Sequence, residues 1–161
     1  MQELSIRRVE RGSTLVIAIP KDCKTILQMP RGNLECIQPR ALSIAIIGKL
    51  LDSLDYLPAF DLMRKQRIYL NLLYDHAPAT FIVNAEKFVK DIKKSNWLSL
   101  FLSDLKNEDV TKTMYKSSYS GRKSEVRDFK VEEVCKRLRL IMEQNSNDYL
   151  QVFIISFKIF E

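Results

Sequence analysis

The sequence predicts a mainly helical protein that begins with a short β-meander and continues as stacked helical hairpins, an α-solenoid. Residues 13–37 are rich in β-branched and apolar residues that turn residues separate, which is typical of short strands. After Pro39, apolar residues recur at helical spacing. The predicted helices are short and closely linked, which favours αα-hairpins, although no fixed repeat period supports the solenoid independently.

The meander has three predicted strands. Residues 14–19 are short, apolar and β-branched, which is typical of a strand buried on both faces. Residues 24–29 and 34–37 form the other two strands, joined by a turn in which Pro30 takes position i+1 and Gly32 adopts a positive φ. Because three strands cannot bury both faces alone, we expect further sheet or the flank of the helices to cover them.

The helical part is predicted as a series of amphipathic segments. In the second helix, Asp55 takes the cap position and Pro58 the first turn. In the first helix, the apolar stripe is expected at Leu42, Ala45, Ile46, Lys49, Leu50 and Leu54. Further helices are expected at residues 70–75, 78–83, 85–94, 97–105 and 131–143.

A break in the pattern divides the helical part. Residues 116–129 are rich in serine and basic residues and poor in apolar ones, which predicts an exposed, flexible basic linker. The last twelve residues are apolar and the chain stops there, so we expect a truncated C-terminal end. The expected organisation is strands at 1–38, solenoid helices at 39–115, the linker at 116–129 and further helices at 130–161.

Composition excludes several classes of function. The net charge of +6 is only mildly basic, and no apolar stretch is long enough to span a membrane. The three cysteines are scattered, which indicates reduced thiols, as in the cytosol or nucleus, and excludes a paired-cysteine metal site. Four glycines in no phosphate-binding pattern leave no cofactor to propose.

Two features are candidates for chemistry or binding. His76 is the single histidine, and we interpret it as structural; a base dyad with Asp75, or a pair with a cysteine, is the alternative. In the basic linker, Arg122, Lys123 and Arg127 accompany Tyr119, and a basic exposed loop is suited to contact a phosphate backbone. The sequence therefore names these three residues as its only candidate binding site and no catalytic site.

Several blocks of residues carry a specific resemblance. These are Leu27–Glu35, Pro39–Leu42, Ala59-Phe60, Met63–Lys65, Arg67-Ile68, Asn71-Leu72, Tyr74–His76, Leu105-Lys106 and Glu108–Tyr115. In this order they resemble the IKAP family, the large scaffold subunits of the Elongator complex, over roughly residues 13–145 of this chain. The final segment, 152–161, departs from the family pattern.

The resemblance implies a fold and a function. It places the first strands at the end of a WD40-type propeller and the helices at the start of an α-solenoid. It implies a non-catalytic scaffold that serves tRNA wobble-uridine modification, in the cytoplasm and also the nucleus. The implied partners are the other Elongator subunits, including the catalytic acetyltransferase, and tRNA through the assembled complex. No membrane is implied, and the parent protein would dimerise through a region outside this chain. Direct tRNA binding by Arg122, Lys123 and Arg127 is the alternative.

Overall fold

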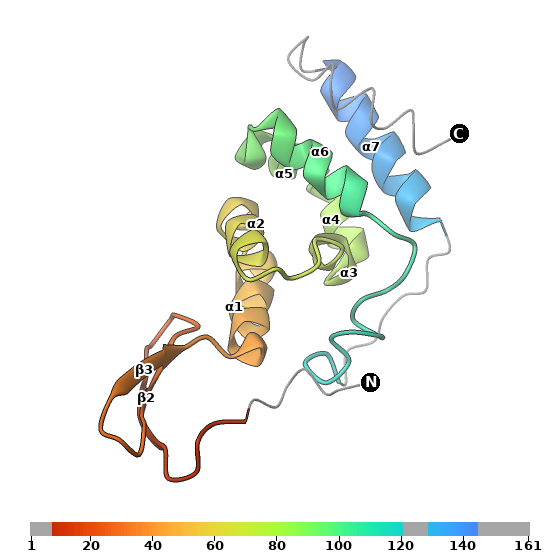
Figure 1. The fold of residues 1–161 in the computed structure, drawn as a ribbon. Coiled ribbons are helices and arrows are strands. Elements are labelled where there is room, and N and C mark those ends of the chain that lie inside the picture. Colours follow the sequence, from red (N-terminus) through yellow and green to blue (C-terminus); the bar gives the residue numbers. More distant parts are fainter. Residues whose placement is uncertain (1–7, 121–128, 145–161) are drawn as a thin grey trace.

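A three-stranded antiparallel sheet at one end is followed by seven helices in the part of the chain that the structure describes (Figure 1). The structure is a computed structural model and describes residues 8–120 and 129–144. The strands are β1 (Thr14–Ala18), β2 (Thr25–Gln28) and β3 (Leu34–Ile37). The helices are α1 (Arg40–Asp52), α2 (Tyr56–Lys65), α3 (Leu72–Asp75), α4 (Pro78–Val83), α5 (Ala85–Ile92), α6 (Ser95–Asp104) and α7 (Lys130–Gln144).

The sheet has the strand order β1-β2-β3, as the sequence predicts. The register of β2 with β3 runs from Thr25 opposite Ile37 to Gln28 opposite Leu34, and an irregularity interrupts the β1–β2 pairing at Val16. In the β2–β3 turn, the Gly32 N–H donates to the Met29 carbonyl at 2.8 Å. Gly32 has φ +87°, so the predicted requirement for a positive φ is confirmed.

The expectation that β1 is buried on both faces is wrong. All five residues of β1 are exposed, and Leu15 and Ile17 retain 64% and 47% of their accessible surface. The buried strand residues instead come from one face of β2 and its entry, at Thr25, Leu27 and Cys23. Among the described residues, the main hydrophobic cluster begins at Ile44 and includes no strand residue, so the helices do not cover β1.

Helix α1 begins after Pro39, but its buried face is not the predicted one. Its buried residues are Ser43, Ile44, Ile47 and Leu51, whereas Leu42 of the predicted stripe is 38% exposed. Apolar residues occupy almost every side of α1, so periodicity alone does not select a face. The contact with α2 makes that selection.

The ends of α1 and α2 are closed without glycine. Leu54 and Arg67 follow the two helices with φ values of 60° and 51°. The next N–H groups, of Asp55 and Ile68, each donate to a carbonyl five residues back at 2.8 Å. This is the Schellman arrangement, which usually places glycine at the left-handed position. At the start of α2, Asp55 takes the predicted cap position but makes no side-chain cap hydrogen bond.

The remaining helices agree with prediction to within a few residues. Helix α4 has the predicted bounds, and α3, α5 and α6 differ only at their ends. Helix α7 buries Val134, Leu138, Ile141 and Met142, as expected. It also buries two residues that the stripe does not include, Cys135 and Lys130.

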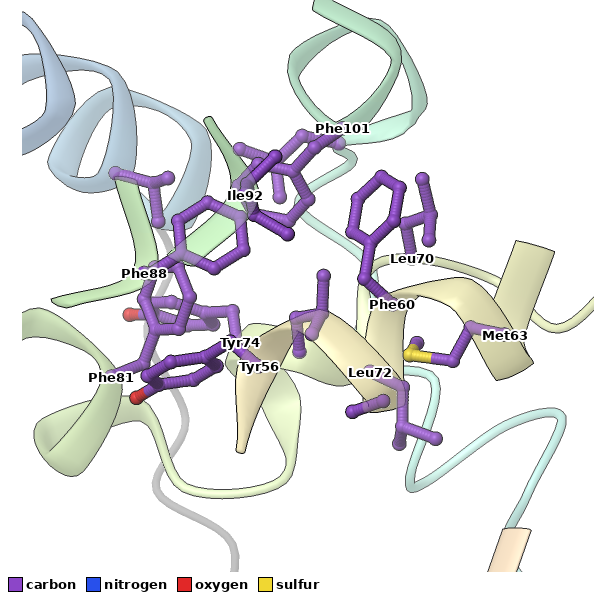
Figure 2. Close-up of a cluster of buried hydrophobic side chains, with 14 of the residues drawn as sticks. Tyr56, Phe60, Met63, Leu70, Leu72, Tyr74, Phe81, Phe88, Ile92 and Phe101 are labelled. Atoms are coloured by element: carbon purple, nitrogen blue, oxygen red, sulfur yellow. The ribbon is translucent and has the colours of Figure 1, made fainter. Parts of the chain in front are cut away.

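The hydrophobic core of the helical part contains a cluster of aromatic rings (Figure 2). Phe81 of α4, Phe88 of α5 and Phe101 of α6 lie within 5.2–5.9 Å of one another, measured between ring centroids. Tyr56 of α2 meets Phe81 and Phe88 edge to face at 6.0 and 5.5 Å. Such contacts add to the stabilisation that comes from burying the rings, so one cluster joins four helices.

Candidate functional site

Buried polar side chains gather around α3, the shortest helix in the described part of the chain. Lys130, the first residue of α7, places its Nζ 2.8 and 3.0 Å from the two carboxylate oxygens of Asp75. The same Nζ donates to the Glu108 carbonyl at 2.8 Å, and Asp75 also accepts the Val110 N–H at 2.9 Å. The side chains of Lys130 and Asp75 are only 2% and 3% exposed. This ion pair therefore ties α3, α7 and residues 108–110 together.

Two opposing effects act on the Asp75 carboxyl. Burial raises the pKa of Asp75, whereas the hydrogen bonds from Lys130 and Val110 lower it. A buried ion pair stabilises a fold only when its remaining hydrogen-bonding groups are also satisfied. The contacts to Glu108 and Val110 supply such bonds, so the arrangement is suited to hold elements in register.

A second set of hydrogen bonds fixes the residues that enter α3. Asn71 is 1% exposed and donates to the Asp104 carbonyl at 2.8 Å, while its side-chain oxygen accepts the Lys106 N–H at 2.9 Å. The Asp104 carboxylate accepts the Leu70 N–H at 3.0 Å. The Tyr115 hydroxyl accepts the Tyr69 N–H at 3.0 Å. These bonds attach the end of α6 and the segment after it to the start of α3.

His76 joins α3 to α1 and to the residues before the basic segment. Its Nε2 lies 2.8 Å from Asp52 Oδ1, and its Nδ1 lies 2.7 Å from the Tyr119 hydroxyl. Gly48 of α1 lies beside the imidazole, and a Cβ placed there would be in van der Waals contact with its Cε1 at 3.4 Å. The alternative dyad with Asp75 is therefore not formed, since Asp75 is bound to Lys130 and the partners of His76 are Asp52 and Tyr119.

The cysteines offer no support for a nucleophile. Cys135 is buried in α7, and burial raises its pKa to about 11, which is opposite to what an activated thiol requires. Cys23 is buried beside β2, and Cys36 is exposed in β3. The structural interpretation of His76 explains its two hydrogen bonds without a cysteine.

The candidate binding residues Arg122, Lys123 and Arg127 lie outside the described residues. Of the predicted linker, residues 116–120 are described, and Tyr119 requires a correction. Its hydroxyl contacts His76 and its ring packs against the core, so this residue is not part of an exposed linker. The neighbouring Ser117, Ser118 and Ser120 are exposed, as expected.

Residues 8–120 and 129–144 show neither grouped metal ligands nor a membrane-spanning helix. No three His, Cys, Asp or Glu side chains there are grouped so that they would hold a metal ion. No helix in that part of the chain has the length and apolar character needed to cross a membrane.

The blocks that carry the sequence resemblance meet around α3. The block Tyr74–His76 supplies Asp75 and His76, and Glu108–Tyr115 supplies the backbone groups bound by Asp75 and Lys130. Asn71 and Lys106, from two further blocks, are directly hydrogen bonded. Residues 40–159 match the family model described as the ELP1 alpha-solenoid. The chain belongs to this family. Its fold class, a short antiparallel sheet followed by α-solenoid helices, is therefore confirmed.

Proteins similar in sequence to this chain of the ELP1 family are named elongator complex protein 1. Putative elongator complex protein 1 of Xenopus laevis is 50% identical over 87% of this chain and 12% of its own length. Elongator complex protein 1 of Drosophila melanogaster is 41% identical over 94% of the chain and 12% of its own length. The Saccharomyces cerevisiae protein of that name is 43% identical over 75% and 9%. The chain thus spans about a tenth of the length of these relatives.

Sequence reasoning about the ELP1-family chain missed the ion pair at its centre. Lys130 lies just outside the predicted helix 131–143, and Asp75 is named only as a partner of His76. One usable signal existed, because Asp75 follows an apolar run that includes Leu72 and Leu73 and is thereby carried into the core. A buried carboxylate requires a cation nearby.

Proposed function

We propose that this chain is part of a non-catalytic scaffold subunit of the Elongator complex. The observation that carries the proposal is the match of residues 40–159 to the ELP1 alpha-solenoid, together with relatives named Elongator complex protein 1. We call the buried polar residues around α3 the hub; its members are Asn71, Asp75, His76 and Lys130. The hub supports a scaffold role, because these side chains hold helices in place. Asp75, Lys130 and Asn71 are each engaged in such bonds.

The proposal extends to the organisation of the parent protein. Residues 1–38 would close a WD40-type propeller, and residues 39–115 and 130–161 would belong to the solenoid, separated by the segment 116–129. The exposed apolar side chains of β1 support the first part, since neighbouring strands would cover them. The parent protein would bind the acetyltransferase subunit. It would also form a homodimer, through a region outside this chain. It would serve tRNA wobble-uridine modification in the cytoplasm and the nucleus.

The test uses a full-length family member in cells. Lys130→Met removes the cation of the buried pair and is expected to reduce both co-purification of the acetyltransferase subunit and wobble-uridine modification. Lys136→Met is the matched control, because Lys136 is on the same helix with its side chain 67% exposed. If Lys130→Met disrupts the helical region and the complex still assembles and modifies tRNA normally, the scaffold proposal fails for this region.

A second candidate function is direct tRNA contact by Arg122, Lys123 and Arg127. One observation favours it: the described residues on either side of 121–128 are bound to adjacent residues of the hub. Tyr119 is bound to His76, and Lys130 is bound to Asp75. The described residues that flank the basic segment are thus both attached to the end of α3.

The tRNA proposal is tested by gel shift at two salt concentrations. The triple variant Arg122→Ala, Lys123→Ala, Arg127→Ala is expected to weaken tRNA binding and to reduce its salt dependence, because fewer phosphates are neutralised. The control replaces Lys65, Lys90 and Lys136 with alanine; their side chains are 65%, 64% and 67% exposed. Equal weakening by both triple variants would indicate only a general effect of charge.

A further inference from the structure

A half-open pocket lies between α2 and the turn from α5 into α6. Its volume is about 440 Å³. Leu57 and Pro58 of α2 contribute exposed apolar surface, with Leu57 43% exposed, whereas the lining residue Ile92 of α5 is only 1% exposed. The other lining residues are Asp61, Asp91, Lys93, Lys94 and Trp97. An apolar floor with polar groups at its edge is the usual character of a binding pocket.

Trp97 of the pocket packs against three neighbouring side chains. Its indole stacks on Phe60, with ring centroids 5.2 Å apart and planes inclined by 14°. Lys94 Nζ lies 4.3 Å from the indole centroid, and Arg64 Cζ lies 4.7 Å from it. The ring is thus occupied by Phe60 and two cations, which leaves little free surface for a nucleic-acid base to stack on.

The charges around the pocket do not balance. Asp61 is paired with Lys65 at 2.6 Å and with Arg64 at 3.7 Å, and the Lys65 hydrogen bond lowers its pKa. Asp91 is paired with Lys87 at 3.1 Å. Within the described part of the chain, neither Lys93 nor Lys94 has an acidic partner within 4.0 Å. Because the two carboxylates are already paired with Arg64, Lys65 and Lys87, the positive charges of Lys93 and Lys94 are not neutralised by an acidic side chain of the pocket.

The backbone places these two lysines at a tight reversal. Lys93 has φ +53°, a left-handed conformation that favours glycine, and the Lys94 N–H donates to the Ile92 carbonyl at 2.6 Å. A lysine at the end of α5 is favourable next to the helix C-terminus. The charge at the helix C-terminus gives a reason for one of the two lysines. It gives no reason for a second lysine next to the exposed apolar residues Leu57 and Pro58.

We propose that this pocket docks an acidic peptide segment of a protein partner. An aliphatic or aromatic side chain of the segment would lie on Leu57 and Pro58. Its carboxylates would pair with Lys93 and Lys94, whose positive charge is complementary. The inference rests on the proposed scaffold function for the partner's place in the Elongator complex, because it specifies where this scaffold holds a partner.

The experiment measures binding of a fluorescent synthetic peptide, rich in glutamate and leucine, to a full-length family member. The double variant Lys93→Glu, Lys94→Glu is expected to weaken binding at least about tenfold, because each reversed charge replaces attraction with repulsion. Lys106→Glu, Lys116→Glu is the matched control. It makes the same charge change at two exposed lysines that do not line the pocket. The control is expected to change binding less than about twofold.

The other outcomes overturn the proposal. Equal weakening by the two double variants would mean general electrostatic attraction. No peptide binding by the full-length protein would mean that the pocket is closed by its own chain or by a second copy. A labelled single-stranded RNA that binds, and is lost only in Lys93→Glu, Lys94→Glu, would assign the surface to nucleic acid. Co-purification of Elongator subunits is measured in parallel, so a failure of the scaffold proposal with intact peptide binding is distinguishable.

Discussion

Lys130 carries a charge into the interior of the helical region, where its side chain is 2% exposed. Its ammonium has three hydrogen-bond donors, and the two Asp75 oxygens and the Glu108 carbonyl accept from it. Apolar side chains of similar volume could fill the same space without the free-energy cost of removing two charges from water. The pair therefore stabilises the fold only to the extent that its hydrogen-bond geometry offsets this desolvation cost. The pair fixes where α7 begins relative to α3.

Replacing Lys130 with methionine is expected to lower the free energy of unfolding by about 3–5 kcal/mol, because Asp75 is left buried without its cation. Denaturant titration measures the change. Lys136→Met, on the exposed side of α7, is expected to change it by about 0.5 kcal/mol or less. The double variant Asp75→Asn, Lys130→Met is expected to be more stable than Lys130→Met alone. A loss of less than about 1 kcal/mol in Lys130→Met would contradict this account of the pair.

The three cysteines are expected to differ in reactivity. Cys36 is exposed, whereas Cys23 and Cys135 are buried. A maleimide at neutral pH is therefore expected to label Cys36 alone in the folded chain and all three residues in denaturant. Mass spectrometry of the labelled peptides gives the pattern. Rapid labelling of Cys135 without denaturant would show that α7 is not packed as described.

Cys135 is also expected to make stability depend on alkaline pH. Its folded-state pKa is raised by burial from 9.0 to about 11, so the folded state holds the proton more tightly than the unfolded state. The stabilising contribution is complete below pH 9 and is lost as the pH rises to 11. At about 1.4 kcal/mol per pKa unit, the loss is about 2–3 kcal/mol. Cys135→Ala is expected to flatten this decline in denaturant titrations, and Cys36→Ala is expected to leave it unchanged.

At the scale of elements, the β2–β3 hairpin shows how far local sequence determines structure. The turn between Met29 and Asn33 and the positive φ of Gly32 were both predictable, because proline and glycine act through their own backbone geometry. The buried face of α1 was not predictable in this way. Its apolar residues surround the helix, so contacts distant in sequence decide that Ile44 and Ile47 are buried and Leu42 is not.

Gly32→Val is expected to destabilise this hairpin by about 1–2 kcal/mol, because a β-branched residue is strained at φ +87°. Crowding is not the reason, since no atom lies within 4 Å of a Cβ placed there. The matched variant Gly32→Asn is expected to cost less, because asparagine tolerates positive φ better. Hydrogen exchange of the β2 and β3 amides is the suitable measurement, since the sheet contributes nothing to the main hydrophobic cluster. Unchanged exchange in Gly32→Val would refute the turn assignment.

For the whole molecule, the sequence predicted the order of the elements and the change from strand to helix at Pro39, which local patterns encode. The hub was not predicted, because Asp75 and Lys130 are 55 residues apart and no periodicity relates them. The family resemblance marked the same region without explaining it. The hydrogen bonds from the Lys106 N–H to Asn71 and from the Val110 N–H to Asp75 give a physical reason for those blocks to occur together.

The central proposal is that these residues belong to a scaffold that binds other Elongator subunits. The most direct measurement is a pull-down of the purified acetyltransferase subunit by residues 1–161, with folding checked by circular dichroism and a tRNA gel shift at two salt concentrations. The account predicts that the folded chain retains the subunit and that tRNA does not shift. A salt-sensitive tRNA shift without the subunit would contradict it, and would assign the function to the basic segment that includes Arg122, Lys123 and Arg127.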